Sequence, residues 1–245
     1  MTKNFELLQR LAKNEFFNIP DEPAPSPNKT RTAIPFKTPP PDTEISQLVQ
    51  RLFTQAGKGN GPKVVSFSGI ACDDGSSWIC ARAGEALAVQ LDTSVCVVDA
   101  NLWSPQLHVH LNADNQIGLA EALSNDGPIQ HFVTPVWNGN LWLISSGSVK
   151  PDLYTPVERY RERFAELRDS FGHILISAPA LSRETEATFI GQLADGVVLI
   201  VEANESRRET VRRAKEHLES ANVRLLGGVL DQRTFPIPEF LYRKL

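Results

Sequence analysis

The sequence has few cysteines, no long apolar run and no excess of positive charge. Cys72, Cys80 and Cys96 are the only cysteines among 245 residues, and no two of them form a CxxC pair. This spacing offers neither a disulfide framework nor a zinc-ligand set, so we interpret the three thiols as reduced. No stretch approaches the roughly 20 apolar residues that a membrane-spanning helix needs. Disulfide-rich secreted proteins, zinc fingers and membrane-spanning proteins are therefore not expected.

The charge balance is slightly acidic, with 25 Lys and Arg against 29 Asp and Glu and a net charge of -4. No overall basic field exists to attract nucleic acid or an anionic membrane surface, so we expect no nucleic-acid partner. The first ten residues, MTKNFELLQR, lack the apolar stretch of a signal peptide, which predicts a cytoplasmic location. A hydrophobic content of 41% indicates a globular domain.

Three terminal segments differ from the rest of the chain. Apolar residues at helical spacing predict a short helix over residues 1–18. Residues 19–41 contain eight prolines, which cannot propagate a helix or a strand ladder, so an extended linker is expected there. A docking segment for a proline-binding module is the alternative. The tail, residues 234–245, should pack back on the domain or else bind a partner through its apolar side chains, Phe235, Ile237, Phe240, Leu241 and Leu245.

Between residues 42 and 233, short β-branched runs alternate with amphipathic segments. This alternation predicts an α/β domain with a three-layer, doubly wound, mainly parallel sheet of P-loop NTPase type. Ligands of such sheets bind outside the carboxyl ends of the strands. The expected strands are 63–68, 95–99, 141–145, 173–177, 196–202 and 223–230, and the expected helices are 77–91, 119–123, 156–170, 184–193 and 207–221.

The loop after the first strand has the order of a phosphate-binding loop, in which a strand, small residues and a helix follow one another. A working loop reads GxxxxGK[ST], with a lysine for the phosphates and a hydroxyl for Mg²⁺. Gly75 matches the second glycine and Ser77 the hydroxyl, but Ser76 stands at the lysine position, and Asp73 and Asp74 lie in the loop. An ordinary capped helix start is the alternative interpretation.

Other strand ends carry further candidate residues. Asp99 ends the second strand, where it could hold Mg²⁺ together with Ser77 or simply cap a turn. Ser177 ends the strand HILIS, where a hydrolytic P-loop protein usually has aspartate. Trp78 is expected to pack in the core, or alternatively to close the pocket over the loop.

These segments, taken in order, resemble the bacterial tyrosine autokinases of capsule and exopolysaccharide export, which are relatives of cell-division and plasmid-partition ATPases. The resemblance rests on the first loop and on VVDANLWSPQLH, ISAPA, LADGVVLIVEANE and LLGGVLDQR. It implies a P-loop NTPase-like domain over residues 42–233, with ATP and Mg²⁺ as cofactors. It also implies a membrane chain-length (polysaccharide co-polymerase) partner or an active kinase paralogue, homo-oligomer formation, and recruitment to the inner face of the plasma membrane.

The chain departs from the family at the positions that matter for catalysis. Ser76 replaces the loop lysine and Ser177 replaces the Walker B aspartate. The asparagine that contacts the base aligns with Asp231. Phosphoryl transfer depends on positioned positive charge and metal, so these changes should cost several orders of magnitude in rate. Asp99 is the best remaining candidate for a catalytic or metal-binding carboxylate.

Two further family features are reduced. The assembly helix E-x-x-R-x-x-R reads Glu44, Gln47 and Gln50, followed by Arg51, which weakens the expectation of ring formation. Tyr242 is the only tyrosine of the tail, whereas kinase members carry a tyrosine cluster there.

Three functional hypotheses follow from the resemblance. The first is a kinase-like regulator or scaffold of polysaccharide production with impaired catalysis, that is, a pseudokinase. The second is an active ATP-dependent tyrosine autokinase with an unorthodox loop, for which phosphate on Tyr242 is expected. The third, a partition-type positioning ATPase, usually requires an intact loop lysine.

Overall fold

The computed structural model describes residues 43–54, 61–71, 75–137, 140–149, 156–203 and 205–231. The helix expected over residues 1–18, the proline-rich linker and the tail from residue 234 lie outside the described residues. The described part belongs to one compact unit that begins at Pro39. None of its helices is long and apolar enough to cross a membrane.

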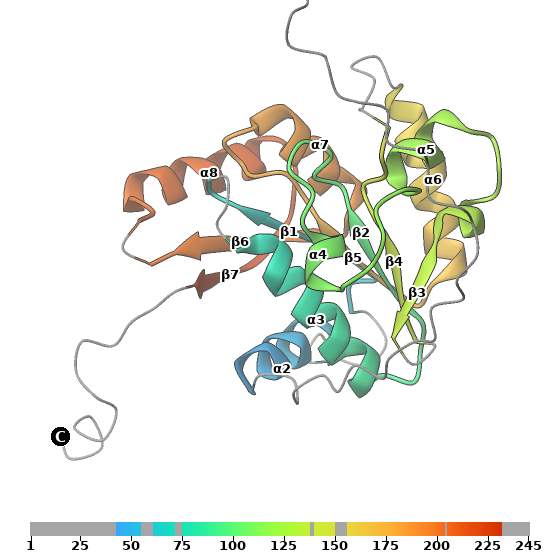
Figure 1. Cartoon of the computed structure of the whole chain (residues 1–245). Helices are drawn as coiled ribbons and strands as arrows, with labels where there is room; N and C mark the ends of the chain where they lie inside the picture. The colour runs from blue at the N-terminus through green and yellow to red at the C-terminus, as the bar shows by residue number, and fades with distance from the viewer. Residues whose placement is uncertain are drawn as a thin grey trace, which may run out of the picture. The chain divides into compact units, whose positions relative to one another are not determined.

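The described residues form a seven-stranded sheet with the order β3-β4-β2-β5-β1-β6-β7 (Figure 1). All neighbouring strands run parallel except β3 and β4, which are antiparallel. After β1 the chain adds β2 to β5 on one side of β1, and then β6 and β7 on the other side. This change of direction confirms the predicted doubly wound, mainly parallel sheet. The strands are β1 Val64–Gly69, β2 Val95–Asp99, β3 Thr134–Trp137, β4 Leu141–Ile144, β5 His173–Ser177, β6 Gly196–Glu202 and β7 Leu225–Asp231.

Helices cover both faces of the sheet. Figure 1 shows α2 and α3 on one face and α5 to α8 on the other. The helices are α2 Thr43–Val49, which continues as the π-helical turn Gln50–Thr54, α3 Ser76–Gln90, α4 Leu107–His110, α5 Leu119–Ser124, the 3-10 turn Ile129–Phe132, α6 Val157–Ser170, α7 Glu184–Leu193 and α8 Arg208–Ser220. This arrangement gives the three layers expected from the sequence.

The central strands are buried on both faces, which explains their continuous apolar sequences. Helix α3 packs closely on the sheet because its inward face is made of small residues, mainly alanines. A Cβ at Gly84 would lie 2.6 Å from Val97 Cγ1, so glycine is required where α3 approaches β2. The close packing of α3 fixes its first turn against the end of β1, where the candidate loop lies.

Three short elements were not expected from the sequence: strand β3, helix α4 and the 3-10 turn Ile129–Phe132. Strand β3 has four residues at the sheet edge, with Thr134 and Pro135 exposed, so it lacks the apolar run that marked the other strands. Helix α4 has only four residues, too few for a helical period to show. It nevertheless places His110 beside the candidate site.

Candidate functional site

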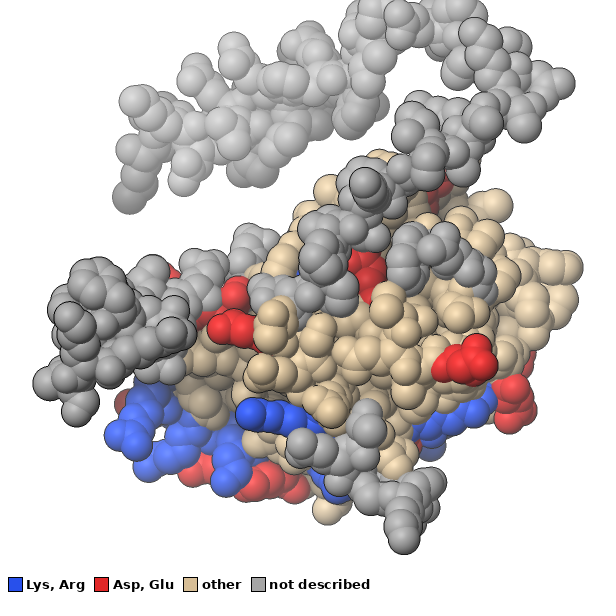
Figure 2. All heavy atoms as spheres, turned by 90° about the horizontal axis from the view of Figure 1, so that it is seen from below, with Lys and Arg blue, Asp and Glu red and all other residues tan. Residues whose placement is uncertain are grey.

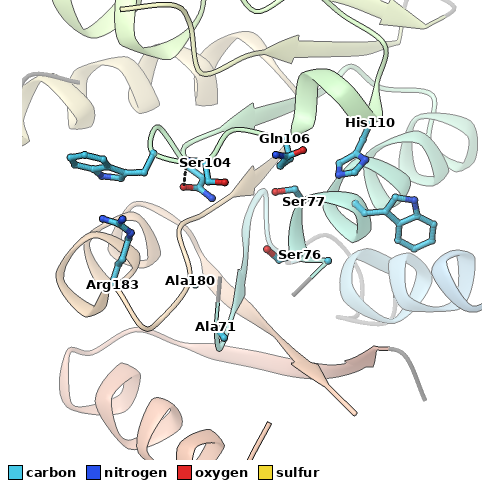
Figure 3. Close-up of a pocket in the computed structure, with 12 residues that line it drawn as sticks. Ala71, Ser76, Ser77, Ser104, Gln106, His110, Ala180 and Arg183 are labelled. Carbon is cyan, nitrogen blue, oxygen red and sulfur yellow. Dashed lines mark hydrogen bonds between the residues drawn. The ribbon is translucent and has the colours of Figure 1, made fainter. Parts of the chain in front are cut away.

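A pocket of about 420 Å³ lies at the carboxyl edge of the sheet, beside the first turn of α3. It is walled by the chain that follows β1, β2 and β5, the three strand ends at which the sequence analysis expected ligands. Figure 3 shows Arg183 and His110 on opposite sides of the opening, with Ser76 and Ser77 between them. The described residues that line it are Ala71, Gly75, Ser76, Ser77, Trp78, Asn101, Trp103, Ser104, Gln106, His110, Ala180 and Arg183.

Gly75 begins helix α3 in the left-handed conformation, with φ 73° and ψ 3°. Its carbonyl oxygen accepts the first helical hydrogen bond from Ile79 N at 3.0 Å. A Cβ added to Gly75 would lie 2.7 Å from Asp231 Oδ2, at the end of β7. The structure therefore brings together two predicted site residues, Gly75 and Asp231, that are far apart in sequence. It also places a carboxylate beside the helix start.

We expect Gly75→Ala to lower the free energy of unfolding by about 1–2 kcal/mol, because a side chain in the left-handed region costs that much. The added methyl group would also press on the Asp231 carboxylate. Gly227→Ala is the matched control, since a Cβ at Gly227 meets nothing within 4 Å. Urea unfolding of both variants measures the difference, and equal losses would contradict the special role of Gly75.

Ser77 and Ser177 lie together under the pocket floor. Their hydroxyl oxygens are 2.9 Å apart in a buried hydrogen bond. One hydroxyl donates to the other, at the place where a metal ligand and a Walker B residue were expected. Ser76 lines the pocket next to them, whereas Asp73 and Asp74 lie outside the described residues.

Asp99 is fully buried and does not line the pocket. Its Oδ2 accepts hydrogen bonds from the backbone N–H groups of Gln106 at 3.1 Å and Leu107 at 3.0 Å, and its Oδ1 accepts one from Asn101 N at 3.3 Å. Burial raises the pKa of Asp99 to about 7, although these backbone bonds oppose the shift. The carboxyl group therefore holds the loop after β2 in place, and its oxygens point to backbone donors.

That loop forms one wall of the pocket and contacts the chain after β5. The Trp103 ring centroid lies 4.9 Å from Arg183 Cζ, and Trp103 Nε1 donates a hydrogen bond to Glu186 Oε1 at 3.1 Å. Arg183 carries the one permanent positive charge among the described lining residues. Our reading of the sequence did not single it out. No local pattern marked it, because it reaches the pocket by packing on Trp103.

Trp78 and His110 complete the wall on the other side. Trp78 is 41% exposed, so the expectation that it packs in the core is wrong, and the alternative of a pocket-lining ring fits its position. Burial lowers the pKa of His110, and the nearby charges of Arg82 and His108 lower it further. His110 is therefore uncharged at neutral pH and adds no positive charge to the pocket.

These donors suit an anion better than a metal ion. The first turn of α3 presents backbone N–H groups that have no acceptor within the helix, and the positive end of the helix dipole, beside Arg183, a combination that can receive phosphate oxygens. A magnesium site would need free oxygen ligands. Asp99, whose oxygens accept three backbone hydrogen bonds, does not line the pocket, and position 177 supplies a hydroxyl instead of a carboxylate. In the described part of the chain, no group of three or more His, Cys, Asp or Glu could hold a metal ion.

The predicted assembly positions lie on one helix and its extension. Ile45 and Val49 bury the inner side of α2, whereas Glu44, Gln47, Gln50 and Arg51 are exposed.

Comparisons with known proteins agree with this fold. No family model matches the chain. Tyrosine-protein kinase CpsD of Streptococcus pneumoniae serotype 4 is 25% identical over 192 residues, which cover 74% of this chain and 81% of the relative. Among solved structures, the chimeric protein CapA2B2 gives a TM-score of 0.68 at 21% identity, covering 78% of this chain and 84% of its own.

A second structural neighbour is the septum site-determining protein MinD, complexed with Mg-ADP, from Pyrococcus horikoshii OT3. It gives a TM-score of 0.59 at 20% identity and covers 74% of this chain and 76% of its own. The resemblance expected from the sequence motifs is confirmed: the chain is similar in sequence to the bacterial tyrosine kinases of capsule and exopolysaccharide production, and it has the P-loop NTPase-type fold that they share with MinD.

Proposed function

We propose that this chain is a kinase-like regulator or scaffold of exopolysaccharide or capsule production whose own phosphoryl transfer is impaired. Its similarity to CpsD supports the link to polysaccharide production. The observation that carries the proposal is the buried hydrogen bond between Ser77 and Ser177. It places a neutral hydroxyl at position 177 beside Ser77, where an active relative needs a carboxylate for Mg²⁺.

The charges around the pocket support the same conclusion. Phosphoryl transfer relies on lysine, arginine and metal ions to neutralise charge as it develops on the phosphoryl group. Here Ser76 is neutral, and Arg183 is the one permanent cation among the described lining residues. The Asp231 carboxylate beside Gly75 adds a negative charge at the helix start. A triphosphate would meet too little positive charge for tight binding or fast transfer.

What remains of the site supports weak binding of a phosphate-bearing ligand. The left-handed Gly75 and the first turn of α3 retain the backbone donors of a phosphate-binding loop. The volume of about 420 Å³ is within the usual size of a small-molecule site. ATP or ADP could occupy it without Mg²⁺, held by backbone N–H groups and Arg183.

Calorimetric titration of the full chain with ATP and ADP, each with and without Mg²⁺, tests the proposal. We expect dissociation constants near millimolar and little effect of Mg²⁺, because Asp99 is buried away from the pocket and position 177 offers a hydroxyl in place of a carboxylate. Micromolar, Mg²⁺-dependent binding would overturn the proposed impairment. Phosphate on Tyr242 after incubation with Mg²⁺-ATP, detected by mass spectrometry, would instead favour the active autokinase.

A regulator without catalysis must act through contacts. We propose that the partner is a membrane chain-length (polysaccharide co-polymerase) protein or an active kinase paralogue, and that residues 19–41 provide the reach of a tether. The exposed residues of α2, Glu44, Gln47, Gln50 and Arg51, are the proposed surface for contact with another copy or with that paralogue. The proposal places the chain in the cytoplasm, at the inner face of the membrane.

A further inference from the structure

A groove of about 870 Å³ lies between helix α8 and the last two strands of the sheet. In Figure 1, β7 forms one edge of the sheet and α8 lies beside it on one face. The floor of the groove is apolar and only partly covered, since Val201, Val211 and Leu225 are half-buried. Gly227 and Gly228 border it without side chains. The groove therefore leaves part of the domain core open.

The outer edge of β7 is also free among the described residues, because β7 is the last strand in the sheet order. The Asp231 carbonyl accepts a hydrogen bond from Ala203 N at 2.9 Å, so the backbone groups of Asp231 face β6. Backbone groups alternate sides along a strand, so those of Leu230 and Gly228 face outward. Leu230 is 52% exposed. An apolar edge of this kind pairs readily with another strand.

Charge does not decide what covers this region. Three of the four Lys and Arg side chains of α8 pair with acids one turn away, Arg212 with Glu216 at 3.4 Å, Arg213 with Glu209 at 2.8 Å and Lys215 with Glu219 at 3.4 Å; the fourth is Arg208. Figure 2 shows basic and acidic side chains next to one another on the left, the side on which α8 lies in Figure 1. We therefore expect an apolar strand, and not an acidic partner, to cover the groove.

The chain itself supplies such a segment directly after β7. The sequence continues QRTFPIPEFLYRKL, with prolines at positions 236 and 238. In an extended strand, residues two apart direct their backbone groups to the same side. Phe235, Ile237 and Glu239 therefore offer a full set of donors on one side, and the proline side offers none. This pattern suits an edge strand, which pairs on one side and resists further pairing on the other.

We infer that residues 235–239 pair antiparallel with the free edge of β7, with Phe235 opposite Leu230 and Ile237 opposite Gly228. The turn 231–234 then has four residues, a common hairpin length. Opposite residues of antiparallel strands share a face of the sheet. Gly228 is in register with Leu199, whose side chain packs in the core under α8.

Gly228 leaves room on that face for the side chain of Ile237. A Cβ at Gly228 would meet only the Leu199 carbonyl oxygen, at 3.6 Å. Ile237 would occupy the space that the glycine leaves open, and Phe235 would cover the exposed Leu230. The occupant of the groove is thus the tail of the same chain.

The direction of this strand has a consequence for Tyr242. Strand β7 ends at the carboxyl edge, where Asp231 contacts Gly75 beside the pocket. An antiparallel strand runs back from that edge, so Glu239, four residues after Phe235, lies about 13 Å further away at 3.3 Å per residue. The docked strand therefore leads the chain toward Tyr242 away from the pocket of its own chain. This inference does not depend on whether that pocket is catalytically active.

Cysteine cross-linking in the full chain tests the register. In a Cys72→Ser background, the pair Gly228→Cys and Ile237→Cys should form an intramolecular disulfide in high yield on mild oxidation. The matched pair Gly228→Cys and Pro238→Cys should not, because position 238 points to the other face. Cys80 and Cys96 do not interfere, since both are fully buried.

Equal disulfide yields from the two pairs would mean chance encounter of a free tail and would overturn the inference. A disulfide between two chains whose yield rises with protein concentration would assign the edge to a second copy and would also overturn it. Amide exchange of Gly228 and Leu230 gives an independent measurement. We expect protection in the natural sequence and at least a tenfold faster exchange in Ile237→Asp, and fast exchange in both would contradict the proposed strand.

Discussion

Lysine at position 76 together with aspartate at position 177 should tighten the binding of Mg²⁺-ATP by about a hundredfold. Ser76 lines the pocket at the start of α3, so a lysine there can reach phosphate oxygens. A hydrogen bond to a charged group contributes about 1.5–3 kcal/mol, and each 1.4 kcal/mol is a factor of ten. An aspartate at position 177 would accept the hydrogen bond of the Ser77 hydroxyl and offer a second oxygen toward Mg²⁺.

Single variants separate the two contributions. Ser76→Lys alone should supply about a tenfold gain without Mg²⁺ dependence, and Ser76→Met, which has similar length and no charge, should supply none. Ser177→Asp alone should destabilise the fold, because position 177 is fully buried and an isolated carboxylate there lacks a cation. Titration calorimetry measures the binding of each. If the double variant binds no tighter than the natural chain, the serine replacements do not explain weak binding.

The fold could be predicted in large part because its central strands leave a clear signal. Strands β2, β5 and β6 are buried on both faces, and their continuous apolar runs gave the expected bounds. Strand β3 lies at an edge and is half exposed, so its four residues have no such run. Long elements follow from a repeated pattern, whereas short ones depend on the contacts around them.

The residues of the site could be predicted only where the order of strand, loop and helix places them. Gly75, Ser76 and Ser77 were expected from the order of strand, loop and helix, and Asp231 from the last strand. Arg183 reaches the pocket by packing on Trp103, a contact between loops that no local pattern encodes. Trp78 was harder to place, because an indole on the first turn of a helix suits a core as well as a pocket wall.

Asp99→Ala should lower the free energy of unfolding by about 3–5 kcal/mol at pH 6, since it leaves three backbone N–H groups without their acceptor. The loop that these groups hold carries part of the pocket wall, including Asn101 and Gln106. Loss of nucleotide binding in this variant would therefore report a displaced loop and would not by itself identify a metal ligand. Asp99→Asn keeps an acceptor oxygen, so it should lower the free energy of unfolding by about 1–2 kcal/mol less than Asp99→Ala does.

The contribution of Asp99 to the free energy of unfolding should also depend on pH. The pKa of Asp99 rises from 3.8 to about 7 because burial disfavours its charged form. Between about pH 4 and pH 7 the folded state then holds a proton that the unfolded state has lost, so this group's contribution to stability is full below pH 4 and falls as pH rises through 7. A shift of about three units corresponds to roughly 4 kcal/mol.

Asparagine at position 99 cannot titrate, so Asp99→Asn should lack this fall in stability. The unfolding free energy of the variant minus that of the natural chain should therefore increase by about 3 kcal/mol between pH 4.5 and pH 8, and other titrating groups cancel in the difference. Urea unfolding of both chains across that range measures it. A difference that stays constant with pH would mean that Asp99 is ionised in the folded protein throughout, its charge stabilised by the backbone donors of Asn101, Gln106 and Leu107 despite its burial.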